Sequence, residues 1–194
     1  MIYLMRHGQD DESYIGGWSD VELIPEGIED VKEASLWIKD NLDIKNIQCS
    51  DVRRAVQTAE IVSECLGVPY SSNANLREQN KGDLNGILRT NLSDDELVLT
   101  SSKSVDTVYP NGECLRDLYN RMKVYISKIM EMEDDTLLIT HRGVINMIYF
   151  DFQYFLQELQ LKINSLSIKL ITSFLYVLKI PSLFSLLKAI LDCL

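Results

Sequence analysis

The start of the chain constrains its fold more than any other stretch. Residues 2–5 form an apolar run that breaks into an Arg-His-Gly triplet at His7, the pattern of a buried strand that ends at a polar site. The chain has only two histidines, and His141 stands in the same setting, after another apolar run and two residues before a glycine. A lone histidine at a strand end is usually structural. Two in one setting, each beside an arginine, predict a functional site where strands end.

The rest of the chain alternates between the two kinds of secondary structure. Further strands are expected at residues 44–49, 68–70 and 136–140. Helices are expected from Pro25 to about residue 42, from a cap at Ser50-Asp51 to a stop at Gly67, at 94–99, at 115–129 and from Val144 onward. This alternation predicts an α/β fold, a three-layer α/β/α sandwich with a mostly parallel central sheet.

That architecture predicts where chemistry takes place. In open α/β sheets, ligands bind beyond the carboxyl ends of the strands. His7, the turn at residues 50–54 and His141 each follow a predicted strand, so we expect them to meet at one edge. A helix starting near residue 50 would add backbone N–H groups that bind anions. Two histidines, several arginines and a helix N-terminus together indicate a phosphoryl site, although the chain has no Gly-x-x-x-x-Gly-Lys nucleotide loop.

Composition excludes several other classes of protein. The formal charge of -10 argues against nucleic-acid binding as the main activity, because phosphate backbones need a basic face. The four cysteines form no Cys-x-x-Cys pair and there are only two histidines, so we expect no metal site. The N-terminus shows no charged and apolar leader, and the thiols are expected to be free. We therefore expect a cytoplasmic protein.

Several short blocks of sequence resemble, in order, the motifs of the histidine phosphatase (phosphoglycerate mutase-like) superfamily. The blocks are Arg6-His7-Gly8, Gly17-Trp18-Ser19-Asp20, Ser50 to Ala59, Leu76-Arg77-Glu78, Pro110 to Glu113 and Thr140 to Ile145. They cover residues 1 to about 150, and their shared order is far more specific than the Arg-His-Gly triplet alone. The resemblance implies a phosphoglycerate mutase-like fold.

The resemblance also implies roles for the histidines and arginines. His7 matches the nucleophile that takes the phosphoryl group, a role open to neutral imidazole. Arg6 and Arg54 match the residues whose planar guanidinium groups clamp phosphate. Spacing alone does not choose between Arg53 and Arg54, and the likeness to the family favours Arg54. His141 matches the second histidine, which would steady the phosphoryl oxygens during transfer.

Five more residues match positions around the substrate. Glu78 matches the proposed general acid, which must be protonated to donate. Gly8, Gly17 and Trp18 match residues close to the substrate phosphate, although a packing role for Trp18 is equally open. Arg142 replaces the glycine or asparagine that commonly follows the second histidine, and it either contacts substrate or points to solvent.

The resemblance implies phosphoryl transfer, for which two reactions are open. Mutases of this family have a longer insertion with extra basic residues, whereas residues 87–111 contain only Arg89 and Lys103 as cations. We therefore expect a phosphatase that hydrolyses small phosphomonoesters through a phosphohistidine at His7, without cofactor or metal. A cofactor-dependent phosphoglycerate mutase remains open, as does a non-catalytic module that binds phosphoproteins.

The C-terminal region extends past the motifs. We expect the histidine phosphatase domain to span residues 1–171, with its final strand at 164–171. Residues 172–194 are an apolar extension that is expected to be helical from Pro181. Packing on the core, self-association as a homodimer and membrane contact are its open roles. Lysines interrupt the segment, so it does not supply the roughly 20 apolar residues of a membrane span.

Overall fold

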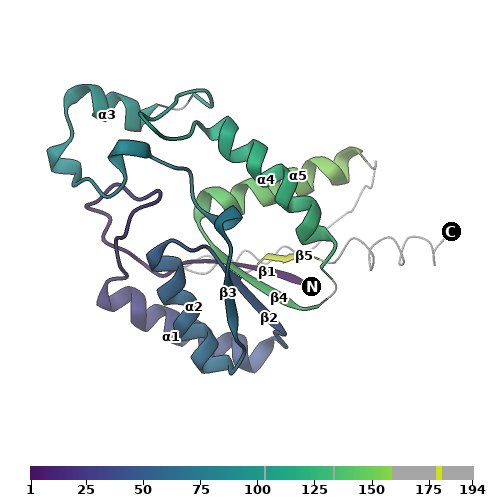
Figure 1. Cartoon of the computed structure of the whole chain (residues 1–194). Coiled ribbons are helices and arrows are strands. Elements are labelled where there is room, and N and C mark those ends of the chain that lie inside the picture. The colour runs from purple at the N-terminus through teal and green to yellow at the C-terminus, as the bar shows by residue number, and fades with distance from the viewer. Residues whose placement is uncertain (103, 133, 159–177, 181–194) are drawn as a thin grey trace.

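The protein forms a five-stranded sheet flanked by helices (Figure 1). The computed structural model describes residues 1–102, 104–132, 134–158 and 178–180. The strands are β1 (Ile2–Arg6), β2 (Asn46–Cys49), β3 (Tyr70–Ser72), β4 (Thr136–Thr140) and β5 (Leu178–Ile180), in the order β3-β2-β4-β1-β5. β5 runs antiparallel to β1, and all other pairs are parallel. The mostly parallel sheet expected from the sequence is confirmed.

The helices form the two outer layers. They are α1 (Pro25–Asn41), α2 (Arg53–Leu66), α3 (Asp94–Ser101), α4 (Leu115–Met130) and α5 (Arg142–Glu158), with 3₁₀ turns at Ala74–Leu76, Gly82–Leu84 and Arg89–Asn91. Figure 1 shows α1 and α2 on one side of the sheet, α4 and α5 on the other, and α3 at a distance from it. This confirms the three-layer sandwich. No helix in the described part of the chain is long and apolar enough to cross a membrane.

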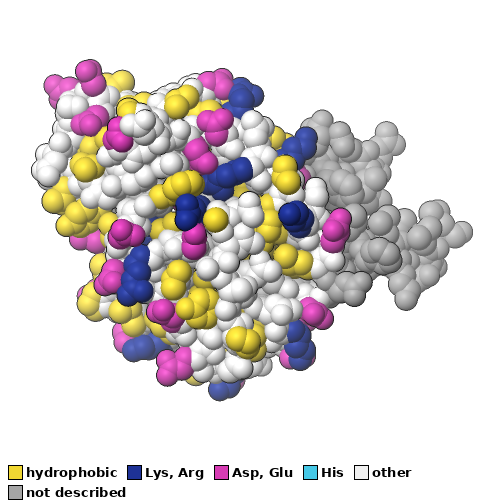
Figure 2. Space-filling model, viewed as in Figure 1, with side chains coloured by type: hydrophobic (Ala, Val, Ile, Leu, Met, Phe, Trp, Pro, Cys, Tyr) yellow, Lys and Arg dark blue, Asp and Glu magenta, His cyan; other side chains and the backbone are white. Residues whose placement is uncertain are grey.

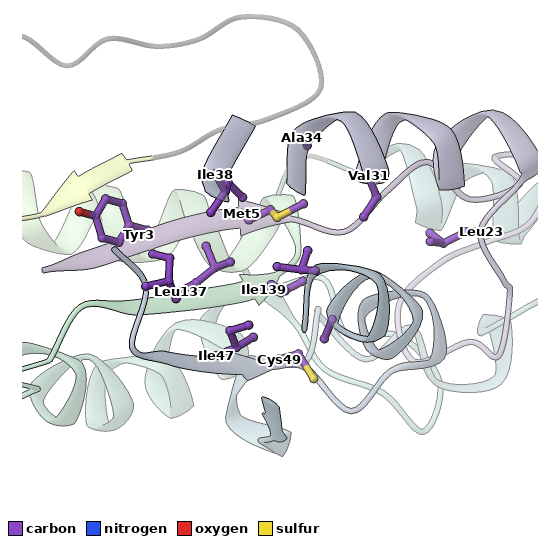
Figure 3. Packing of buried hydrophobic residues seen from close by; sticks show 13 residues of the cluster. Tyr3, Met5, Leu23, Val31, Ala34, Ile38, Ile47, Cys49, Leu137 and Ile139 are labelled. Atoms are coloured by element: carbon purple, nitrogen blue, oxygen red, sulfur yellow. The ribbon is translucent and has the colours of Figure 1, made fainter. Parts of the chain in front are cut away.

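Strand β1 explains why the chain opens with an unbroken apolar run. Successive side chains of a strand point to opposite faces of the sheet. Tyr3 and Met5 pack with Ile38 of α1 in the core layer drawn in Figure 3. Ile2 and Leu4 pack on the other face, against α4 and α5. Because helices cover both faces, every position of β1 before its last residue must be apolar.

The expected cap of α2 at Ser50-Asp51 is wrong. The helix begins three residues after Ser50, and Val52 precedes it with no side-chain capping bond. Ser50 Oγ instead accepts a hydrogen bond from the Val52 N–H at 3.3 Å. Both carboxylate oxygens of Asp51 lie 2.6 Å from the Arg77 guanidinium. Ser50 therefore contacts the residue before the helix, Asp51 contacts the distant Arg77, and the helix starts without a cap from either side chain.

The other element boundaries agree with the sequence to within a few residues. α1 begins at Pro25, as expected. α2 ends at Leu66, just before Gly67, whose φ of 70° is the left-handed conformation that glycine adopts most easily. β2 starts at Asn46 rather than at residue 44, and α5 starts at Arg142 rather than at Val144.

The described part of the tail contains a strand that the sequence analysis did not predict. Residues 178–180, inside the extension expected to be helical, form β5 and pair with Ile2 to Leu4 of β1. The free side of β1 supplies the backbone partners, and the apolar Leu178 and the β-branched Ile180 flank the single lysine of this strand. The final strand expected at 164–171 and the helix expected from Pro181 lie outside the described residues.

We expect deletion of residues 178–194 to destabilise the protein. The deletion removes β5 and leaves the backbone N–H and C=O groups of one side of β1 without their strand partner, which also favours association between chains. The melting temperature should fall by about 5 °C or more, and sedimentation should show larger species. A shorter deletion of residues 181–194 keeps β5 and serves as the control. Equal melting temperatures for the two truncated chains would contradict a stabilising role for this strand.

Candidate active site

Polar side chains follow three neighbouring strands and meet at one edge of the sheet. His7 follows β1, Ser50 follows β2 and His141 follows β4. The backbone N–H groups of His7 and Ser50 both donate to the end of β4, to Thr140 O and Ile139 O at 2.9 Å each. The two imidazole rings lie with their centroids 5.0 Å apart. The histidines therefore meet as expected. Both are buried, and no histidine is visible on the face drawn in Figure 2.

Contacts at both ring nitrogens fix the tautomer of His7. Nδ1 lies 2.7 Å from the carbonyl oxygen of Gly8, and because a carbonyl only accepts, Nδ1 must donate the proton. Nε2 keeps its lone pair and accepts from Arg54 Nε at 3.1 Å. Burial, followed by the positive charges of Arg54 and Arg6, holds the pKa of His7 well below its usual value. This neutral form is the one in which histidine acts as a nucleophile.

The structure places Arg54, and not Arg53, at the histidines. The side chain of Arg54 is 2% exposed, and its terminal nitrogens donate to Gly17 O at 2.9 Å and Ser19 Oγ at 3.2 Å. Arg53 is exposed and pairs with Glu22 at 3.0 Å. Consecutive helical residues are rotated by about 100°, so only one of the two arginines can face the sheet edge.

Arg6 offers a second guanidinium group at the end of β1. Its Nε is the one buried side-chain nitrogen or oxygen without a hydrogen-bond partner among the described residues. A buried donor without a partner costs about 1–3 kcal/mol. The planar fork of arginine matches the geometry of phosphate oxygens. Arg6 is therefore suited to bind an anion beside His7.

His141 contacts Arg54 but, unlike Arg54, does not line the cavity. A guanidinium group only donates, so His141 Nδ1 accepts from Arg54 Nη2 at 3.3 Å, and Nε2 donates to Ser50 Oγ at 2.9 Å. Burial, followed by the neighbouring His7 and Arg54, holds the pKa of His141 well below its usual value. This role of Ser50 was not predicted from the sequence, although the position of a serine directly after a strand was a usable signal.

A cavity of about 570 Å³ opens beside His7 and Arg54. Its wall contains the basic residues Arg6, Arg54, Lys81, Arg89 and Arg142 and the acidic residues Asp10, Glu12 and Glu78. Basic side chains are thus in excess here although the whole chain has a net charge of -10, which favours an anionic ligand. Asp10, Glu12, Tyr14, Lys81 and Arg89 were not predicted as site residues. The described residues contain no group of three or more His, Cys, Asp or Glu side chains that could hold a metal ion.

Backbone contacts orient the carboxyl group of Glu78 at this wall. Its oxygens accept from the N–H groups of Gln79 at 2.9 Å and Gly143 at 3.0 Å. A Cβ atom on Gly143 would lie 2.2 Å from Glu78 Oε1, so a glycine is required beside this carboxyl group. Arg121 of α4 donates to the Glu78 carbonyl at 2.8 Å and pairs with Glu113 at 2.9 Å. Arg121 therefore positions the segment that contains Glu78.

The three remaining residues predicted for the site differ in their placement. Gly17 lines the cavity and has a φ of 69°. Gly8 and Trp18 do not line it. The Gly8 N–H donates to Thr58 Oγ1 at 3.0 Å, and Trp18 Nε1 donates to the carbonyl of Glu78 at 2.7 Å. The placement of Trp18 favours packing and positioning over contact with a ligand.

The chain is similar to known proteins of one family. The family model described as the histidine phosphatase superfamily (branch 1) matches residues 2–172. Human 6-phosphofructo-2-kinase/fructose-2,6-bisphosphatase 4 is 31% identical over 81% of this chain, which spans 33% of the human protein. The uncharacterized phosphatase PhoE of Bacillus subtilis is 28% identical over 75% of this chain and 73% of its own length.

Solved structures share the fold. A putative α-ribazole-5′-P phosphatase from Escherichia coli superposes with a TM-score of 0.69, at 21% identity and over 77% of each chain. Other relatives bear the names of phosphoglycerate mutases, so the matched proteins are enzymes of phosphoryl transfer. Since the family model covers most of the sequence, the protein belongs to branch 1 of the histidine phosphatase superfamily.

Proposed function

We propose that the protein is a phosphatase that hydrolyses small phosphomonoesters through a phosphohistidine at His7. The supporting observation is the lone pair of His7 Nε2, held 3.1 Å from Arg54 Nε at the wall of a predominantly basic cavity. A phosphate group in this cavity would contact Arg54 and Arg6, and the buried Nε of Arg6 has no hydrogen-bond partner of its own. Two guanidinium groups next to a neutral nucleophile fit the charge of a phosphoryl group during transfer.

The proposed reaction has two half-reactions. In the first, His7 Nε2 forms a bond to phosphorus while the bond from phosphorus to the ester oxygen breaks. Glu78 gives a proton to the leaving oxygen as that bond breaks. In the second, water adds to phosphorus, Glu78 takes back a proton from the water, and the N–P bond breaks to release phosphate. Arg6 and Arg54 bind the phosphoryl oxygens, and His141 holds Arg54 in place.

A cofactor-dependent phosphoglycerate mutase is the second candidate. Lys81, Arg89 and Arg142 extend the basic wall beyond the phosphoryl position, and a mutase must hold two phosphate groups. Two of these cations already contact protein atoms, however. Lys81 Nζ lies 2.7 Å from Gln79 Oε1, and Arg89 Nε donates to the carbonyl of Glu12 at 2.9 Å. Residues 87–111 also contain only Arg89 and Lys103 as cations, and this shortage of basic residues favours hydrolysis.

A screen of the full chain with sugar phosphates, phosphoglycerates, nucleotides and phosphopeptides tests the proposal. Release of inorganic phosphate supports the phosphatase. Transfer of phosphate between positions of one substrate supports the mutase instead. Binding without either reaction would show a non-catalytic module.

We also propose that residues 1–171 are the catalytic domain and that residues 172–194 are an extension of it. The family model supports this boundary because its match ends at residue 172.

We expect Arg54→Lys to lower the rate about 10²- to 10³-fold, as when a preorganised donor to the transition state is lost. Lysine keeps the charge but lacks the planar fork that contacts several oxygens at once. Arg53→Lys, one residue away and exposed, is the matched control and should keep its activity.

Chelators should leave the wild-type rate unchanged, because guanidinium groups supply the countercharge in this proposal. A rate that collapses in chelator and returns with magnesium would contradict it.

A further inference from the structure

Asp10 places a carboxylate at the most strongly basic part of the cavity. Its Oδ2 lies 3.4 Å from Arg54 Nε, and the side chains of Asp10 and Arg54 are 12% and 2% exposed. Asp10 lines the same cavity as His7 and Arg6. It belongs to no motif in the sequence analysis, and the proposed reaction gives it no role.

The position of Asp10 matters because of the nitrogen atom that it faces. Arg54 Nε also donates to His7 Nε2 at 3.1 Å, the atom on which a phosphoryl group would be placed. Asp10 is held there by its backbone, which forms a β-bridge to Leu23. Phosphate bound to Arg54 would therefore lie next to a fixed negative charge.

Two effects of this carboxylate predict opposite results. If Asp10 orients Arg54, removing its charge should weaken anion binding. If Arg54 is oriented without Asp10, the carboxylate only repels the anion, and removing its charge should strengthen binding. Arg54 also contacts Gly17 O, Ser19 Oγ and both histidines, so the second effect should dominate.

We propose that Asp10 weakens the affinity of the cavity for inorganic phosphate and thereby promotes release of the product. This inference rests on the proposed phosphatase function, in which phosphate leaves the same cavity after every turnover. Arg6 and Arg54 attract the phosphoryl group of a substrate, and the charge of Asp10 limits how tightly the free product remains bound.

The test compares phosphate binding by Asp10→Asn and the wild type. Titration calorimetry with inorganic phosphate should show about tenfold tighter binding to Asp10→Asn, as expected from removing one unit charge near a dianion in a partly hydrated site. Inhibition of turnover by phosphate should become tighter by the same factor. Asp10→Glu keeps the charge and should bind phosphate within a few-fold of the wild type. Asp11→Asn is the matched control, because Asp11 is exposed and contacts Ser13 rather than the cavity.

Each outcome separates this inference from the proposed function. Tighter binding in Asp10→Asn alone supports the role of Asp10. Equal or weaker binding in Asp10→Asn, with normal binding in the wild type, overturns that role and leaves the phosphatase proposal in place. If the wild type releases no phosphate from any substrate of the screen, the phosphatase proposal fails and the inference fails with it. Equal strengthening in Asp11→Asn would show a general effect of net charge and would also overturn it.

Discussion

His7→Ala should lose turnover by a factor on the order of 10⁶, the loss typical of removing a covalent nucleophile. His7 lines the cavity, where its neutral Nε2 has a lone pair that accepts one hydrogen bond from Arg54, whereas His141 does not line the cavity and contacts Arg54 and Ser50. Quenching the wild type during turnover of labelled substrate should trap phosphate on the protein in an acid-labile, base-stable form. The same quench of His7→Ala should trap none.

The control for this prediction is the fold of the variant. His7 contributes a buried ring that contacts Arg54, so the melting temperature of His7→Ala must be measured beside its activity. A folded His7→Ala protein with full activity would exclude the covalent mechanism. Labelled phosphate trapped on that variant would mean that another residue is the nucleophile.

Glu78→Gln should lose about 10² to 10⁴ in rate on a sugar or glycerol phosphate, the usual contribution of general acid catalysis. Breaking an alkyl phosphate expels an alkoxide, which leaves slowly unless a proton arrives as the bond breaks. A nitrophenolate leaves readily without a proton. On p-nitrophenyl phosphate, Glu78→Gln should therefore lose far less. His7→Ala should be inactive on both substrates, because both need the nucleophile.

Glu12→Gln is the matched control for Glu78→Gln, because both glutamates line the same cavity. It removes the same charge and should change the two rates by similar factors. If Glu78→Gln also slows both substrates equally, Glu78 positions the substrate or supports the fold, and the proton comes from elsewhere. Its two bonds from backbone N–H groups make this alternative specific, since they use both carboxyl oxygens, and one of these becomes an NH2 group that cannot accept in glutamine.

The sheet and its ligand edge could be predicted because their signals are local. β1 and β4 are buried on both faces, which requires continuous apolar runs, and each run ends at a histidine. The two histidines therefore identified the edge of the sheet where the cavity opens. Their separation along the chain did not matter, since parallel neighbouring strands end at the same edge.

Other parts of the site depend on partners far away in sequence, which a local pattern does not contain. Asp51 is a suitable helix cap by residue type, but its ion pair with Arg77, 26 residues away, determines its position. Arg121 reaches Glu78 across 43 residues, and no feature of α4 marks it. The choice between neighbouring Arg53 and Arg54 depends on the rotation of α2 against the sheet, which is set by packing. Asp10 was missed because its role comes from the arginine that it faces.

The contacts of Arg54 have a consequence for how the protein acquires its site during folding. Its partners Ser19, Gly17, His7 and His141 lie 35, 37, 47 and 87 residues away along the chain. Closing such long loops is entropically unfavourable and slow compared with forming a helix. A chain that has regained its helices, but has not yet brought β4 beside β1, lacks the partner that holds Arg54 against the sheet edge. The anion site is therefore completed only after the central strands have paired.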